Sequence, residues 1–89
     1  MDQSEARALL ATHLASYRRQ SYGELVALIG NPRVAEIAGP SGVPYQIEVE
    51  VRWDSPSERT DVRVLGGIDD GRFSGALSPV SDSFIRSPG

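Results

Sequence analysis

The chain has 89 residues, of which 39% are hydrophobic and 24% are charged, with a formal net charge of −3. These proportions are ordinary for a folded protein, and the length predicts a single domain over residues 1–89. The nine basic residues are all arginine and there is no cysteine, which excludes disulfides, thiol nucleophiles, thiolate metal sites and lysine Schiff-base chemistry. The acidic balance argues against nucleic acid as a partner.

The location of the protein is predicted from what the chain lacks. No stretch approaches the roughly 18 apolar residues of a membrane helix. The N-terminus opens with Asp2 and Glu5, and it has no basic segment followed by an apolar run. We therefore expect no signal peptide, no membrane partner and a cytoplasmic location.

Two helices are expected at the start of the chain. Asp2 and Glu5 have the spacing of a capping box, and Ser21 and Glu24 repeat it before a second, shorter helix that ends at Gly30. The first helix carries an apolar stripe formed by Ala6, Leu9, Leu10, His13, Leu14 and Tyr17. A pair of helices this small needs a sheet to cover their apolar sides.

Alternating side chains predict strands in the second half. A short strand over 33–38 is followed by the clearest one, 45–53, with apolar and polar residues in strict alternation. The next strand carries Val62, Val64 and Ile68 on its apolar face. Such alternation is typical of an antiparallel sheet with one face on the core and the other in water.

The register between these two strands is predicted from charge. With Trp53 opposite Thr60, Arg52 faces Asp61 and Glu50 faces Arg63, so both polar pairs are of opposite sign. A shift by two residues would place Arg52 against Arg63. Because opposite charges across a sheet are favourable and like charges are not, the first register is expected.

The dipeptide Asp70-Gly71 predicts a two-residue hairpin turn. A fourth strand over 72–78 would then pair Gly66 with Gly75, Pro79 would end it, and the segment 84–85 would fold back as an apolar anchor. The predicted fold class is α+β, with two N-terminal helices packed on one face of a four-stranded antiparallel meander sheet.

One place for a ligand follows from this pairing. Gly66 facing Gly75 leaves a hollow on the inner face, to be filled either by the first helix, through His13 or Tyr17, or by a ligand. The ligand-binding residues would then be His13, Tyr17, Tyr45, Trp53, Gly66 and Gly75. His13, the single histidine, is more simply explained as a half-buried core residue.

Other acidic and glycine-rich features have simpler explanations. Asp69 and Asp70 lack the spacing of a calcium loop and fit a turn. Glu48 and Glu50 lie on a solvated strand face without a cleft, and the run 66–71 lacks the ending of a phosphate loop. We therefore nominate no catalytic residue, and we expect no metal and no cofactor.

Several segments carry a family resemblance: Tyr45-Gln46-Ile47-Glu48, Trp53-Asp54, Val62-Arg63-Val64, Ile68-Asp69-Asp70-Gly71, Pro79-Val80 and Ser83-Phe84-Ile85. In order and spacing they resemble a family of small uncharacterised bacterial proteins over residues 21–88. The resemblance implies a fold of helices followed by a sheet, and it implies no activity. Helices that precede a curved antiparallel sheet are also distantly similar to the NTF2-like fold.

Two functions are compatible with these features. The favoured one is a small non-catalytic interaction module that pairs with itself or with a protein partner through an edge strand, the fourth strand being the expected edge. The alternative is a small-ligand binder or minor enzyme that uses the hollow between helix and sheet near His13.

Overall fold

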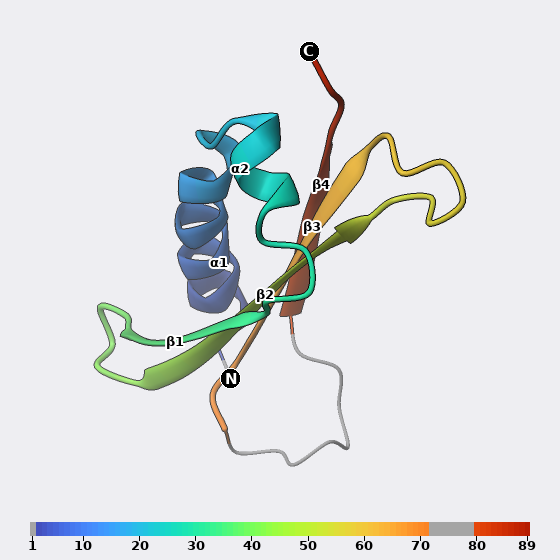
Figure 1. Cartoon of the computed structure of the whole chain (residues 1–89). Helices are drawn as coiled ribbons and strands as arrows, with labels where there is room; N and C mark the ends of the chain where they lie inside the picture. Colours follow the sequence, from blue (N-terminus) through green and yellow to red (C-terminus); the bar gives the residue numbers. More distant parts are fainter. Residues whose placement is uncertain (1, 72–79) are drawn as a thin grey trace.

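The computed structural model describes residues 2–71 and 80–89 (Figure 1). Two helices precede an antiparallel sheet whose four strands lie in the order β1-β2-β3-β4. The elements are α1 (Gln3–Arg18), α2 (Tyr22–Val26), β1 (Arg33–Ala38), β2 (Pro44–Trp53), β3 (Val62–Asp69) and β4 (Val80–Arg86). The predicted α+β class and the meander order are confirmed. None of the helices in the described residues is long and apolar enough to cross a membrane.

Both helices begin at the predicted N-cap residues, but the capping box expected at Asp2 and Glu5 is not completed, because the Glu5 carboxylate bonds to Ser41 and Tyr45. The side chain of Asp2 accepts a hydrogen bond from the amide of Glu5 at 3.1 Å. At α2, the Ser21 hydroxyl accepts from the Glu24 amide and the Glu24 carboxylate accepts from the Ser21 amide, which completes a capping box. After α2 the chain continues in turns to Gly30, whose φ of +85° is a conformation that glycine adopts without steric cost.

Both helices lie on one face of the sheet (Figure 1), and the buried side chains of the core lie between them and that face. The α1 stripe packs on β3 and β4, and α2 packs on β2 and β3. The helices contribute five buried side chains to the core: Ala6, Leu10, Leu14, Tyr17 and Leu25. The sheet contributes Tyr45, Ile47, Val49, Val51, Val62, Val64, Ile68, Val80 and Phe84. We call this sheet face the inner face and the opposite one the outer face.

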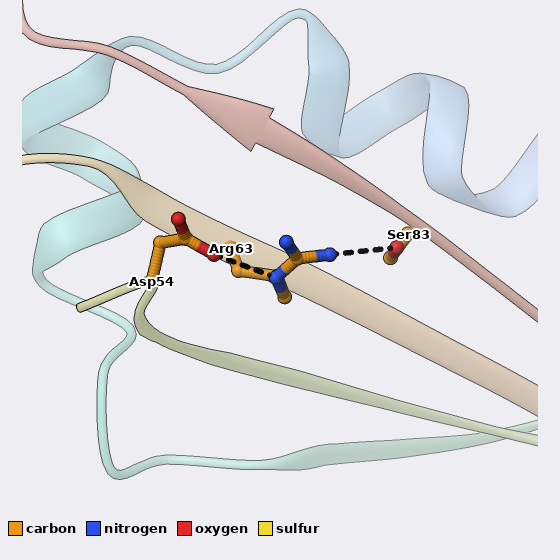
Figure 2. A network of polar contacts seen from close by, with 3 residues as sticks. All are labelled: Asp54, Arg63 and Ser83. Carbon is orange, nitrogen blue, oxygen red and sulfur yellow. Dashed lines mark hydrogen bonds and ion pairs between the residues drawn. The ribbon is translucent and has the colours of Figure 1, made fainter. Parts of the chain in front are cut away.

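The predicted register between β2 and β3 is wrong by two residues. Trp53 lies opposite Val62, and Arg52 lies opposite Arg63. Arg63 avoids its like-charged neighbour because its Nε donates to Asp54 Oδ1 at 2.8 Å and its Nη1 donates to Ser83 Oγ at 3.3 Å (Figure 2). A diagonal contact thus removes the charge conflict on which the prediction depended.

The predicted position of the fourth strand is also wrong. β4 starts at Val80, directly after Pro79, and pairs Val80 with Ile68 and Phe84 with Val64. Asp69 Oδ1 accepts from the amide of Gly71 at 2.9 Å, so these residues form a local side-chain turn. The segment 72–78, where we expected the strand, lies outside the described residues. Phe84 is buried as expected, whereas Ile85 is exposed.

Candidate functional site

The predicted hollow is centred on Gly66, on strand β3. A Cβ atom added at Gly66 would lie 2.9 Å from Leu10 Cδ1 and 3.0 Å from Leu14 Cδ2. Both leucines are 1% exposed. The first helix therefore fills this space, as one of the two expectations had it, but it does so with leucines and not with His13 or Tyr17.

The pairing across Gly66 differs from the expected one. Its neighbours are Val49 on β2 and Asp82 on β4, so the facing pair of glycines is not formed. Gly75 lies outside the described residues.

The other predicted ligand residues are spread over the core. The rings of His13 and Tyr17 are in contact, with centroids 5.8 Å apart and planes at 50°. Tyr45 and Trp53 lie at opposite ends of β2, about 26 Å apart along the strand. The structure brings His13 and Tyr17 together, and it places Tyr45 and Trp53 in separate surroundings.

A polar cluster that the sequence did not reveal joins α1 to the turn between β1 and β2. Glu5 Oε1 accepts from the hydroxyls of Ser41 and Tyr45, each at 2.7 Å, and Glu5 Oε2 accepts from the Ser41 amide at 3.0 Å. These hydrogen bonds lower the pKa of Glu5, and the bond from the Ser41 hydroxyl has the largest effect. The hydrogen bond to the Glu5 carboxylate in turn raises the pKa of Tyr45 to about 12. A carboxylate so fully bonded is a poor base, so the cluster positions the turn.

Few groups in the described residues are suited to catalysis or metal binding. They contain no cluster of three or more His, Asp or Glu side chains that could hold a metal ion. Within the same ranges, no buried side-chain nitrogen or oxygen lacks a hydrogen-bond partner. An orphaned polar atom in a cavity, the usual sign of a missing ligand, is thus not found there.

The two edges of the sheet differ. Val34 on β1 and Ile85 on β4 are the exposed large hydrophobic side chains of the described residues, at 55% and 45%, and both lie on the outer face. On β4, Asp82 Oδ1 accepts from the amide of Ser83 at 2.8 Å, and Arg86 donates to the carbonyls of Gln20 and Arg18 at the end of α1. At the β4 edge, the Asp82 side chain therefore occupies a backbone amide of the strand, and Arg86 joins the strand to α1.

Strand β1 has no comparable protection. All six of its residues are exposed or half-buried, which is true of no other strand in the described residues. Within the same ranges, β1 is paired only with β2. About half of the backbone groups of such an edge strand point away from its neighbour and can bond to another strand.

Comparison of the chain with protein-family models, with curated proteins and with solved structures finds no match. The resemblance to small bacterial proteins therefore stays a prediction.

Proposed function

We propose that this domain is a non-catalytic interaction module that accepts a strand of another polypeptide along the free edge of β1. The observation that carries the proposal is the exposure of β1, a regular six-residue strand with one neighbour in the described residues and with Val34 open on its outer face. Pairing at such an edge gains backbone hydrogen bonds, while alternate side chains provide specificity.

The fourth strand is the less suitable of the two edges. On β4 both charged side chains are engaged: Asp82 accepts from the Ser83 amide, and Arg86 is bonded to the end of α1. β1 also carries two charged residues, Arg33 and Glu36, but neither side chain forms a hydrogen bond or an ion pair in the described residues. We therefore move the expected contact from the fourth strand to β1.

The small-ligand alternative has less support. It requires open space over Gly66, and the side chains of Leu10 and Leu14 occupy that space. We also propose a cytoplasmic location, because the fold needs no disulfide: the chain has no cysteine and its core is built from packed apolar side chains.

The experiment is a selection of eight-residue peptides from a display library against the whole chain. Binding of the selected peptides is then mapped by amide chemical shifts. We expect the shift changes to be largest over 33–38. The variant Val34→Lys should weaken binding, because a lysine there removes the apolar contact next to the edge, and lysine is a common protector of strand edges.

Ile85→Lys is the matched control, since it replaces another exposed apolar residue on the same face at the other edge. The control should bind the peptides as the wild type does. Light scattering over a range of concentrations shows whether a second copy occupies the edge instead, and a dimer lost in Val34→Lys would also support the module. Shift changes over β4 or over the helices, or a monomer for which no peptide is selected, would contradict the proposal.

A further inference from the structure

The outer face next to the free edge carries carboxylates that form no ion pair in the described residues. Glu36 lies on β1, and Glu48 and Glu50 lie on the adjacent strand β2. The register places Val34 opposite Glu48 and Glu36 opposite Gln46, so all these side chains share one face. In the described residues, none of the three glutamates forms a side-chain hydrogen bond or an ion pair.

Among the described residues, the cations of the outer face lie beyond the part of β2 that pairs with β1. Arg52 is the next outer-face residue after Glu50 and faces Arg63, which is bonded to Asp54 (Figure 2), so Glu36 and Glu48 are the carboxylates beside β1 that lie away from these cations. Arg33 belongs to β1 but projects from its inner face, because it pairs with the buried Val49. The outer surface beside β1 is therefore negative.

The position of an added strand follows from sheet geometry. Its outer side chains would stand about 5 Å from those of Val34 and Glu36. Glu48 would be two strand spacings away, about 10 Å, within reach of an extended lysine or arginine lying across Val34. On the inner face the added strand would meet Arg33 at the start of β1 and then Ala35 and Ile37, which favour apolar residues.

We infer that the partner strand is a basic extended segment of another protein, with lysine or arginine on its outer face and apolar residues on its inner face. This inference rests on the proposed function of β1. It adds the chemistry of the occupant, which the exposed edge alone does not specify.

A second copy of the chain is disfavoured by the same charges. Two copies paired antiparallel through β1 form one continuous sheet with their outer faces on the same side, so the Glu36 and Glu48 carboxylates of both copies lie on one face of it. The outer neighbours of Glu36 on β1 are Val34 and Ala38, neither of which is charged. Where Arg52 faces Arg63, Asp54 provides an adjacent counter-ion, and no cation on the outer face of β1 would do so for Glu36.

The test compares three acetylated nine-residue peptides with the full chain. In each peptide the five positions of one face alternate valine and threonine, and the four positions of the other face are all lysine, all glutamine or all glutamate. Binding is followed by amide shifts over 33–38 at low salt. We expect the lysine peptide to bind about fivefold tighter than the glutamine peptide, and the glutamate peptide to bind most weakly. The advantage of lysine should shrink as salt is added.

Charge variants assign the effect to the named residues. The double variant Glu36→Gln/Glu48→Gln should reduce the advantage of lysine to less than about twofold. Glu58 is an exposed carboxylate in the loop between β2 and β3. Its replacement in Glu58→Gln removes one negative charge at a site distant from β1, and the advantage of the lysine peptide should stay unchanged.

The outcomes separate the inference from the proposed function. Equal binding of the three peptides at β1, or a dimer that forms through β1, would overturn the basic partner and leave the interaction module standing. Failure of all three peptides to perturb 33–38, in a chain that stays monomeric, would overturn both.

Discussion

At Gly66, a missing side chain determines how closely the first helix approaches the sheet. The two leucines above it lie within 3.0 Å of where a Cβ would be. The sequence predicts a close approach or a hollow at Gly66, because a glycine inside a strand often marks a place where another part of the chain or a ligand comes near. It could not say that Leu10 and Leu14 provide the contact, because that depends on how the helix is placed along β3.

A substitution at Gly66 tests this packing. Gly66→Ala should lower the free energy of unfolding by about 1–3 kcal/mol, because the new methyl overfills a closed core. Urea denaturation measures the loss. Gly23→Ala is the control: a Cβ there meets nothing within 4 Å, and alanine favours helices, so stability should not fall. Unchanged stability in Gly66→Ala would show that the space over this glycine is open, as the ligand-binding alternative requires.

The Glu5 cluster predicts a pH dependence. Its hydrogen bonds lower the folded-state pKa of Glu5 below its ordinary value of 4.5. Ionised Glu5 therefore stabilises the fold above that value, and the contribution is lost as the pH falls through the lower, folded-state pKa. Wild type should be more stable than Glu5→Gln at pH 7, and the difference should narrow below pH 4.5. Thermal unfolding at a series of pH values measures this.

Tyr45 provides a second measurement on the same cluster. Its pKa is raised to about 12, first by its hydrogen bond to Glu5. In Glu5→Gln, ultraviolet absorbance should show that one tyrosine ionises at a lower pH than in wild type. Glu50→Gln, which removes a carboxylate with no side-chain hydrogen bond in the described residues, should not change the tyrosine titration. A titration unchanged in Glu5→Gln would contradict the contact.

At the scale of the elements, the sequence predicts where helices and strands lie better than how the strands pair. The caps at Asp2 and Ser21 and the alternation of β2 are local signals, and all three are confirmed. A register shift of two residues keeps every side chain on its face, so burial does not distinguish the two alternatives. The predicted register then depends on charge pairs worth about 0.2–1 kcal/mol. One diagonal ion pair from Arg63 to Asp54 is enough to favour the other register.

The same ambiguity affects the fourth strand. Segment 72–78 and the observed β4 both offer apolar residues at alternate positions, with Phe84 in the observed strand. The Asp70-Gly71 signal favours the nearer segment. Because pairing depends on contacts distant in sequence, the turn alone could not locate the strand, and the edge at β1 emerged as the better site only from the structure.

The observed register predicts a stabilising substitution. Arg52→Glu replaces a like-charged cross-strand neighbour of Arg63 with an opposite charge, on an exposed face. We expect a gain of about 0.2–1 kcal/mol in the free energy of unfolding, measured in urea at low salt. Arg52→Gln removes the repulsion between the two arginines without adding an attraction to Arg63, so it should give a smaller gain in the free energy of unfolding. In the register expected from the sequence, Arg52 would face Asp61, and the glutamate variant would lose stability instead.

At the scale of the whole molecule, the first and last elements are joined. Arg86 at the end of β4 donates to the carbonyls of Gln20 and Arg18, 66 and 68 residues away, and the guanidinium of Arg18 lies 4.5 Å from the Phe84 ring centroid. The carbonyls at the C-terminal end of a helix lack partners and attract cations. Arg86 thus attaches the edge strand β4 to α1, whereas β1 at the other edge makes no such contact in the described residues.

Removal of this attachment should loosen one edge of the sheet and leave the other unaffected. Arg86→Ala should cost about 1.5–3 kcal/mol, the range for hydrogen bonds from a charged group. Arg86→Lys should retain part of the stabilisation that Arg86→Ala loses, because an ammonium keeps the charge but lacks the planar group that reaches two carbonyls. Hydrogen exchange should accelerate over 80–86 and stay unchanged over 33–38. If exchange accelerated equally in both edge strands, Arg86 would contribute only to global stability, and the contrast between a closed β4 edge and an open β1 edge would not hold.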